Sequence, residues 1–423
     1  MNKTICVIGT GYVGLPLCIE FSKFFKVIGY DVQKERILSL KKNYDTNNDI
    51  GKNELNILKK NKVIFTDKIS KDYNVDVFIV TVPTPINKKK KPELKHVISA
   101  TKKIGKILKK NNLVIYESTV FPGTTEDICI PILEKSSGLK INNDFYVGYS
   151  PERLSPGNKN HGLKDIIKIT SGSNNYALNQ VDNLYKKIVS KGTFRAKNIK
   201  IAEAAKVIEN TQRDINIAFI NELVLLFSKL NINTSEVLKA AETKWNFAKF
   251  QPGLVGGHCI AVDPYYLHYI GSKKGYKPKL IMPARKVNDN MSGHVVSKTL
   301  KILRTRNFKL KDSKILILGF AYKENCSDTR NTPVYNIYKR LKDKVKIVDI
   351  MDPNVRIEQV SKDFDIKINF QNTNSYDAII FAVPHKNIFS LLKKNTKNFK
   401  KNKNFVIDIK YCLNNKKIDI IPI

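Results

Sequence analysis

A glycine-rich turn at residues 9–14 restricts the first part of this 423-residue chain to a narrow set of folds. The apolar run Lys3–Ile8 predicts a strand, Leu15–Phe24 a helix, and Phe25–Gly29 a second strand followed by Asp31. The turn, GTGYVG, has the G-x-G-x-x-G spacing of dinucleotide-binding βαβ units. In such units the first glycine allows the turn, the second admits a pyrophosphate to the helix N-terminus, and the third lets the helix pack closely.

Asp31 indicates which dinucleotide the unit prefers, because a carboxylate at this position accepts hydrogen bonds from the ribose hydroxyls and repels a 2′-phosphate. The sequence therefore predicts NAD rather than NADP, bound at Gly9, Gly11, Gly14 and Asp31.

The α/β alternation continues, with strands expected at 75–82, 113–118 and 145–149 and a helix at 97–108. The turns that follow these strands carry Pro83-Thr84-Pro85, Thr119 and the segment SPERLSPG, which contains Glu152. Ligands of doubly wound sheets bind at the carboxyl ends of the strands, so these turns are candidate site segments. Taken alone, Glu152 also fits a surface acid.

Residues 200–230 are predicted to form one long helix with apolar residues on most faces, which requires burial on several sides. Lys206 and Asn210 lie four positions apart and so share a face of it. They are either functional groups or a pair of solvent-facing polar residues. Further helices are expected at 233–241 and 283–304.

A second doubly wound sheet is predicted from strands at 314–319, 345–349, 377–383 and, as the last one, 405–409. A helix is expected to open at Asp328-Thr329-Arg330. This half lacks G-x-G-x-x-G and should bind a different ligand; Lys323, Arg330 and Lys386 at its edge suit a pyrophosphate, or are ordinary surface cations. The predicted class is α/β, with two Rossmann-like doubly wound domains joined by a long central helix and a helical core.

The segment PGLVGGHCIAVDPYYL, at 252–267, places Cys259 after a glycine-rich bend and Asp263 four residues later. Near a helix start the thiolate of Cys259 would be favoured, and Asp263 would lie on the same face. A thiol and a carboxylate in this setting suit covalent chemistry at a carbonyl. The alternatives are a structural cysteine, or a metal site of His258, Cys259, Asp263 and His268, whose spacing matches no standard pattern.

The composition limits which cellular compartment and which binding partners are expected. The six cysteines are scattered without a C-x-x-C pair, which favours a reducing compartment. No signal peptide or membrane span is visible, so a cytoplasmic protein is expected. The net charge of +36 raises the possibility of nucleic-acid binding, but the lysines are spread along the chain beside asparagines, which favours a compositional bias on solvated faces.

Taken together, the motifs resemble the UDP-glucose/GDP-mannose dehydrogenase family over nearly the full chain. The stretches that carry the resemblance are GTGYVG, TVPTP, ESTVFPGTT, SPERLSPG, AEAAKVIENTQRDINIAFINEL, KWNFAKFQPGLVGGHCIAVDPYYL and GFAYKENCSDTRNTPV. SPER and GGHCIAVDPYYL are similar to the branch that oxidises UDP-N-acetylhexosamines. The family architecture implies an NAD domain at 1–195, a helical dimerisation core at 196–304 and a UDP-sugar domain at 305–423. It also implies a homodimer, no resident metal, no nucleic-acid or membrane partner, and a role in making surface polysaccharide precursors.

The resemblance also implies roles for individual residues. Cys259 matches the nucleophile, Lys206 and Asn210 the pair on the long helix, Asp263 the following acid, Thr119 the water-positioning threonine and Glu152 the acid of the SPE loop. The implied cofactor contacts are Gly9, Gly11, Tyr12, Val13, Gly14, Asp31, Arg36, Thr81, Pro83, Thr84, Thr119 and Arg330. The implied substrate contacts are Glu152, Arg153, Leu154, Lys206, Asn210, Lys249, Gly256, Tyr322 and Lys323.

Two departures from the glucose-type members bear on the substrate. Those members often carry a second acid where this chain has Pro156, and a late arginine where it has His385 and Lys386. UDP-N-acetylglucosamine or UDP-N-acetylgalactosamine is therefore expected, with UDP-N-acetylmannosamine or UDP-glucose as the alternative. A two-electron hydroxy-acid dehydrogenase would leave Cys259 without a task, and a nucleic-acid-binding protein would explain only the charge.

Overall fold

The computed structural model describes residues 3–47, 50–153, 162–366, 368, 376–395, 403–414 and 418–423, so Leu154 and Pro156 lie outside the described residues. The chain divides into two compact units, which are described separately below. The first comprises residues 1–209 and 265–276, and the second comprises 210–264 and 277–423.

The first unit is built on a sheet with the order β3-β2-β1-β4-β5-β6-β7-β8, in which all neighbours are parallel except β6 and β7. The first six positions have the strand order of the dinucleotide-binding fold. The strands are β1 Thr4–Ile8, β2 Lys26–Tyr30, β3 Ile64–Thr66, β4 Val77–Val80, β5 Leu113–Tyr116, β6 Tyr146–Tyr149, β7 Lys168–Gly172 and β8 Thr193–Arg195.

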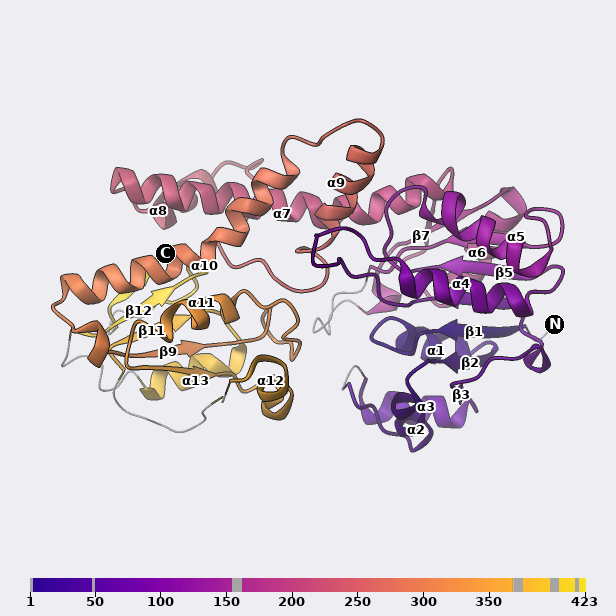
Figure 1. Ribbon diagram of the computed structural model, residues 1–423, viewed down its shortest axis with the longest axis horizontal. Coiled ribbons are helices and arrows are strands. Elements are labelled where there is room, and N and C mark those ends of the chain that lie inside the picture. Colours follow the sequence, from indigo (N-terminus) through magenta and orange to yellow (C-terminus); the bar gives the residue numbers. More distant parts are fainter. Residues whose placement is uncertain are drawn as a thin grey trace. The chain divides into compact units, whose positions relative to one another are not determined.

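Helices cover both faces of this sheet (Figure 1). One core packs α1, α3 and α6 against the sheet, and the other packs α4, α5 and the start of α7 on the opposite face. Successive strand residues alternate between the two cores, as Cys6 and Val7 do, because side chains of a strand point to opposite faces. The helices are α1 Gly14–Ser22, α2 Lys34–Lys41, α3 Lys52–Lys60, α4 Lys95–Ile107, α5 Ile130–Ser137, α6 Asn175–Lys186 and α9 Asp263–Lys273, with shorter helical turns at Lys71–Tyr73, Thr125–Cys129 and Leu163–Asp165.

The second unit contains a five-stranded, fully parallel sheet with the order β10-β9-β11-β12-β13. Helices α10 and α11 pack on one face and α13 on the other (Figure 1). The strands are β9 Lys314–Leu318, β10 Ile347–Met351, β11 Ala378–Phe381, β12 Phe405–Asp408 and β13 Ile420–Pro422. The helices are α8 Thr234–Ala241, α10 Ile281–Thr305, α11 Val334–Leu341, α12 Ile357–Phe364 and α13 Lys386–Asn395, with a short turn at Leu310–Asp312.

Three predictions for this unit need correction. The strand at 405–409 is not the last, because β13 pairs with β12 at the sheet edge. The strand expected at 345–349 begins two residues later, at Ile347. Helix α11 begins at Val334 and not at Asp328. Two residues prevent an earlier start: Asn331 has a positive φ of 52°, and Pro333 disfavours helical backbone at Thr332, the residue before it.

Helix α7, Ile199–Leu230, begins within one residue of its predicted start and ends at its predicted end. It belongs to both units, which divide between Glu209 and Asn210. Its neighbour α8 is capped by Asn233, whose side chain accepts a hydrogen bond from Ser235 N at 3.0 Å.

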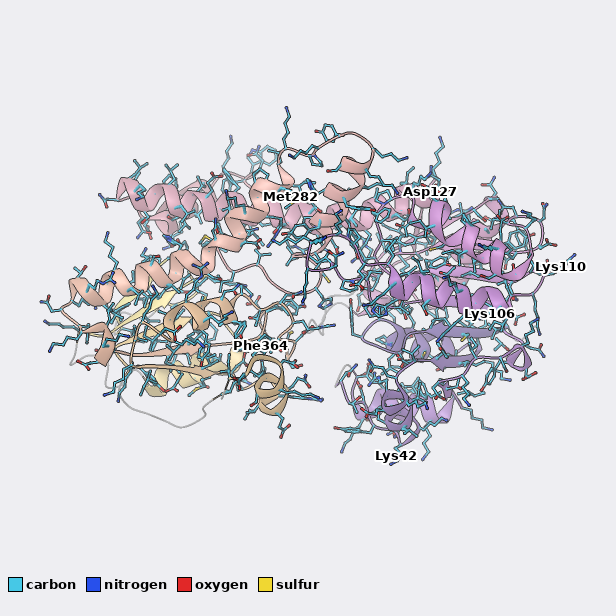
Figure 2. The ribbon with its side chains drawn as sticks, in the orientation of Figure 1. Lys42, Lys106, Lys110, Asp127, Met282 and Phe364 are labelled. Atoms are coloured by element: carbon cyan, nitrogen blue, oxygen red, sulfur yellow. The ribbon has the colours of Figure 1, made fainter. Side chains whose placement is uncertain are left out.

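Many lysines of the first unit lie on solvated faces, as the composition predicted. Lys42, Lys106 and Lys110 are exposed and their side chains extend away from the ribbon (Figure 2). Within the described ranges, no helix combines the length and apolar character needed to span a membrane.

Candidate active site

The glycine turn of the first unit is locked by its neighbours in the sheet. Gly9 follows β1 with a φ of +99°, and its carbonyl accepts a hydrogen bond from Thr81 Oγ1 at 2.8 Å. A Cβ on Gly14 would lie 1.8 Å from Gly9 O and 2.6 Å from Thr81 Oγ1, so only glycine fits there. Strand β4 ends at Val80 and is shorter than the predicted 75–82, and Thr81, the next residue, turns its side chain to the glycine turn.

Asp31 and Arg36 hold the same turn from the other side. Asp31 Oδ2 accepts a hydrogen bond from Thr10 N at 2.9 Å, and Oδ1 accepts one from Gln33 N at 3.0 Å. Arg36 is buried, donates to Thr10 O at 2.8 Å and pairs with Asp45. Both predicted cofactor residues therefore also shape the turn on which a dinucleotide would rest.

The carboxyl ends of β5 and β6 carry Thr119 and Glu152. Glu152 is not a surface acid, because only 5% of it is exposed, and its carboxylate lies 3.7 Å from Lys206 Nζ. Thr119 is half-buried directly after the strand-end segment Glu117-Ser118. Arg153 pairs with Glu209 at 2.7 Å.

Two further predicted contacts lie after β4. Pro83 is exposed and Thr84 is half-buried. The hydroxyl of Tyr266, on α9, donates to Thr84 O, which ties the loop after β4 to that helix within the first unit.

The polar pair on α7 is buried rather than solvent-facing. Lys206 and Asn210 are 5% and 8% exposed, one helical turn apart. In the second unit Asn210 Nδ2 donates to Asp263 Oδ2 at 2.6 Å, so the carboxylate fixes the orientation of the amide.

The cysteine bend lies directly before helix α9. Cys259 O accepts a hydrogen bond from Asp263 N at 2.8 Å, so the two residues are joined by one helical turn, as predicted. Gly257 has a φ of +82°, and a Cβ there would lie 2.5 Å from the Tyr322 ring. Cys259 is half-buried and is not bonded to another described cysteine in a disulfide. Within the described part of the chain, no group of three or more His, Cys, Asp or Glu side chains could hold a metal ion.

The loop after β9 brings Tyr322 and Lys323 to the carboxyl edge of the second sheet, where Lys323 Nζ lies 5.8 Å from the Tyr322 ring centre. Burial lowers the pKa of Lys323. Arg330 binds Asp328 at 2.5 Å, and His258 Nδ1 lies 3.4 Å from the same carboxylate. Although burial opposes it, the hydrogen bonds from His258 and Arg330 lower the pKa of Asp328.

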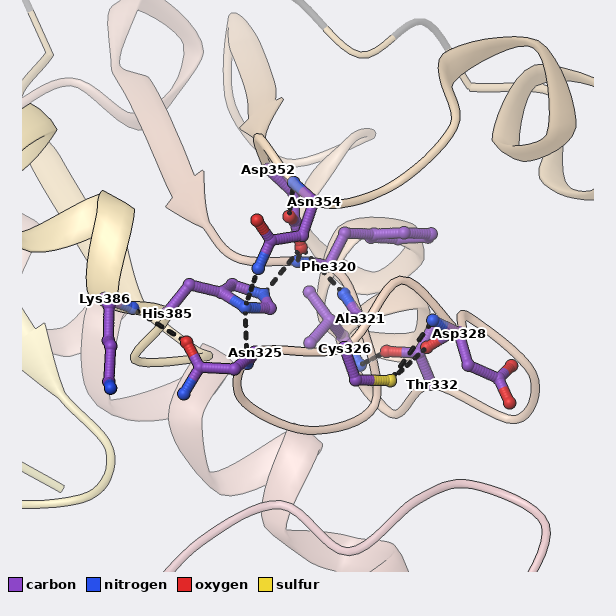
Figure 3. Close-up of polar contacts among 11 residues, drawn as sticks. Phe320, Ala321, Asn325, Cys326, Asp328, Thr332, Asp352, Asn354, His385 and Lys386 are labelled. Atoms are coloured by element: carbon purple, nitrogen blue, oxygen red, sulfur yellow. Dashed lines mark hydrogen bonds and ion pairs between the residues drawn. The ribbon is translucent and has the colours of Figure 1, made fainter. Parts of the chain in front are cut away.

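A buried network connects the strand ends of the second sheet (Figure 3). Asp352 Oδ2 accepts hydrogen bonds from the backbone N–H groups of Phe320 and Ala321 at 2.6 and 2.9 Å, and contacts His385 Nε2 at 3.0 Å. His385 Nδ1 accepts a hydrogen bond from Asn325 N at 2.9 Å. Asp352 and His385 thereby set the course of the loop that carries Lys323.

Three family models match consecutive parts of the chain. The NAD binding domain, the central domain and the UDP binding domain of the UDP-glucose/GDP-mannose dehydrogenase family match residues 3–189, 200–290 and 316–415. The chain belongs to this family. It is an NAD-dependent oxidoreductase with a UDP-sugar as its small-molecule partner.

Relatives match along almost the whole chain. A UDP-N-acetyl-D-glucosamine 6-dehydrogenase of Salmonella typhi is 47% identical over 98% of both chains. Protein CapL of Staphylococcus aureus is 43% identical over 99% of this chain and 98% of its own. Among solved structures, a UDP-D-ManNAc dehydrogenase from Pyrococcus horikoshii has a TM-score of 0.85 at 31% identity, covering 99% of this chain and 98% of its own.

The residues of the glycine turn fit the NAD of this family. A Cβ on Gly11 would meet no heavy atom within 4 Å, so the turn leaves open space above the start of α1. Tyr12 is half-buried and Val13 is buried beside it. Asp31 and the N–H groups at the start of α1 would hold the ribose and the pyrophosphate.

The structure brings together some predicted residues within each unit. In the first unit these are the glycine turn with Asp31, Arg36 and Thr81, and Glu152 with Lys206. In the second they are Asn210 with Asp263, and Gly257 with Tyr322. Lys249 is exposed, and no described contact brings it to the others.

Two pairs of buried ionisable side chains near the strand ends were not predicted from the sequence. Glu117 and Lys168 pair although they lie 51 positions apart, and Asp352 and His385 although they lie 33 apart. Their positions in the sequence could have indicated them, because Glu117, Asp352 and His385 each follow the carboxyl end of a buried strand.

Proposed function

We propose that this enzyme oxidises C6 of a UDP-N-acetylhexosamine, in the glucosamine or galactosamine series, from alcohol to carboxylate. The observation that carries the proposal is the full-length likeness, at 47% identity, to a protein named UDP-N-acetyl-D-glucosamine 6-dehydrogenase. The oxidation removes four electrons, and NAD, when bound, accepts a hydride from the sugar in each of two successive oxidations.

Cys259 is proposed to capture the aldehyde formed by the first oxidation. Its sulfur forms a bond to the aldehyde carbon, which gives a thiohemiacetal and prevents escape of the aldehyde. Lys206 and Asn210 donate hydrogen bonds to the developing oxyanion, and one such donor is typically worth about 2.7–4 kcal/mol. The bond from Asn210 to Asp263 supports this role, since it holds the amide in one orientation.

The second oxidation leaves a thioester on Cys259, and water must hydrolyse it. Thr119 positions the water and Glu152 accepts its proton, so that the carboxylate product and the thiolate separate. The burial of Glu152 beside Lys206 supports its assignment to this step.

The nucleotide end of the substrate is assigned to the second unit and to the loop after β6. Tyr322 and Lys323 on the loop after β9, with Gly256, Lys249 and Arg153, are the proposed substrate contacts. Arg330 is proposed to contact the cofactor. The cationic Lys323 and the matched UDP binding domain support a diphosphate ligand here.

The active enzyme is proposed to be a cytoplasmic homodimer that supplies precursors of a surface polysaccharide. Helix α7 supports the dimer, because it exposes apolar side chains at positions that fall on one face of a helix. These are Ile201, Ile208, Phe219, Leu226 and Leu230, each at least 45% exposed. The same proposal includes three domains, an NAD domain at 1–195, a helical dimerisation core at 196–304 and a UDP-sugar domain at 305–423.

A panel of UDP-sugars with NAD tests the substrate. We expect UDP-N-acetylglucosamine or UDP-N-acetylgalactosamine to give the highest kcat/KM, with two NADH formed per sugar and a uronic acid by mass spectrometry. A higher kcat/KM for UDP-glucose or UDP-N-acetylmannosamine would show that the sugar is wrongly assigned. One NADH per sugar would indicate a two-electron enzyme.

A further inference from the structure

A charged cluster with no role in the proposed chemistry lies in the interior of the first unit. Lys168, the first residue of β7, donates to Glu117 Oε2 at 2.5 Å. Tyr185, on α6, donates its hydroxyl to Glu117 Oε1, and Lys168 Nζ lies 5.0 Å from the Tyr185 ring centre. Glu117 is 1% exposed and the other two side chains are fully buried.

Stability alone does not explain such a cluster. Desolvation of two buried charges often exceeds their mutual attraction, and apolar residues of similar volume are frequently as stable. Burial raises the pKa of Glu117 and of Tyr185, although Lys168 opposes the shift at Glu117. The ion pair is therefore maintained at a cost, and its other contacts indicate what it holds.

Those contacts lie directly after β5 and β6, at the carboxyl ends of the two strands. Lys168 Nζ donates a second hydrogen bond, to Pro151 O at 2.9 Å, and Glu117 O accepts one from Glu152 N at 3.4 Å. Ser118 O accepts one from Tyr149 OH at 3.3 Å. The cluster thus joins the two strand ends directly before Thr119 and at Glu152.

We propose that Lys168, together with Glu117 and Tyr185, is a positioning group for thioester hydrolysis. It fixes the segment that carries Thr119 relative to the segment that carries Glu152, so that one water is held by the first and deprotonated by the second. This inference rests on the proposed function.

The step balances without any further reactant. The water oxygen forms a bond to the thioester carbon, Glu152 takes a water proton, and the carbon–sulfur bond breaks with its electron pair on Cys259 Sγ. Both oxidations precede this step. Loss of the positioning group should therefore spare NADH formation in the first turnover and slow only the release of the acid.

The test is rapid-quench kinetics of Lys168→Met with NAD and UDP-N-acetylglucosamine, beside the wild type. We expect a burst of two NADH per active site followed by slow turnover, and intact-protein mass spectrometry should detect the sugar acyl group on the enzyme. A misplacement of about 1 Å can cost on the order of 10²-fold in rate, which sets the expected fall in kcat.

A second variant guards against misfolding, since Lys168→Met leaves Glu117 buried without its cation. The double variant Lys168→Met/Glu117→Gln removes both charges, and we expect it to fold as the wild type does while still accumulating the acyl-enzyme. The matched control is Asp182→Asn on α6, whose carboxylate binds Thr170 and Thr193 at 3.0 and 2.5 Å. This substitution perturbs β7 and α6, which also carry Lys168 and Tyr185, and we expect no burst of NADH.

The outcomes separate the two claims. Wild-type turnover in both Lys168 variants, or a fall in kcat without a covalent adduct, would overturn the positioning role. An acyl-enzyme in Asp182→Asn would overturn it as well, because any disturbance of this region would then suffice. A wild-type enzyme that yields one NADH per sugar would overturn the proposed function and this inference together.

Discussion

Among single residues, Cys259 has the surroundings that point most directly to a chemical role. It is half-buried, follows a bend that only glycine can make, and is joined to Asp263 by a helical turn. A structural cysteine needs none of these features, whereas a nucleophile needs access to its substrate and a fixed backbone.

Cys259→Ser is therefore expected to abolish turnover while NAD and the UDP-sugar still bind. Serine can add to an aldehyde, but its ester is hydrolysed less readily than a thioester, so a sugar–enzyme ester should be trapped. We expect kcat to fall by on the order of 10³-fold or more. Steady-state kinetics and intact mass measure this, with Cys412→Ser, at an exposed thiol, as the control. A variant that keeps a tenth of wild-type activity would leave Cys259 as packing.

Asp31 supports a prediction about the cofactor. Asp31 follows β2 directly and its carboxylate holds Thr10 of the glycine turn, so Asp31→Ala removes both the charge and this support. Asp31→Asn keeps the shape and removes the charge that would repel a 2′-phosphate. For both variants we expect the ratio of kcat/KM for NAD over NADP to fall by about tenfold or more, which is about 1.4 kcal/mol. Glu35→Gln, an exposed acid nearby, should leave the ratio unchanged. An unchanged ratio in Asp31→Asn would remove Asp31 from the ribose site.

At the scale of the element, helix α7 carries Lys206 and Asn210 on buried positions and an apolar stripe on exposed ones. Two residues of this stripe, Phe219 and Leu226, lie two helical turns apart on the same face and are 54% and 49% exposed, and exposed apolar patches commonly mark interaction surfaces. A second copy of the chain would remove this surface from water.

Leu226→Asp is expected to weaken the proposed dimer, because each subunit would then bury a carboxylate without a counterion. We expect the dissociation constant to rise by at least about tenfold, or about 1.4 kcal/mol. Light scattering over a concentration series measures it. Ser228→Asp adds the same charge about 200° around the helix and should have no such effect. If both variants behave as the wild type, the stripe is not the interface.

The elements themselves were largely predictable, whereas their polar partners were not. The βαβ unit and α7 follow from local patterns, since apolar periodicity and a glycine turn act over a few residues. The burial of Glu152, and the pairing of Glu117 with Lys168, depend on which strands become neighbours in the sheet. Strand β13 was missed because its three residues are too few for a periodic pattern. The start of α11 was misplaced because Asp328 fits an N-cap, yet its carboxylate binds Arg330 and His258 instead.

For the whole molecule, which carries a net charge of +36, buried carboxylates are expected to contribute to the pH dependence of stability, because burial shifts the pKa of a carboxyl group between the unfolded and folded states. Glu203 is one of these. It lies fully buried on α7 and accepts hydrogen bonds from the N–H groups of Gly123 and Thr125 at 2.6 and 2.9 Å. Burial raises its pKa from 4.5 to about 7, against the opposing effect of these bonds.

This shift predicts how stability changes with pH. Between pH 4.5 and about 7 the native state holds a proton on Glu203 that the unfolded chain has lost. The free energy of unfolding should therefore fall as pH rises through this window, by roughly 3 kcal/mol in total. Glu203→Gln lacks this contribution. Its free energy of unfolding should therefore change much less between pH 4.5 and about 7 than that of the wild type. Hydrogen exchange of peptides from the first unit, measured at several pH values, reads this difference without contributions from the second unit.

Asp127→Asn, at an exposed carboxylate on the same segment (Figure 2), is the control and should keep the wild-type slope. Equal slopes for the wild type and Glu203→Gln would mean that Glu203 stays ionised in the folded enzyme, held so by the two backbone N–H groups.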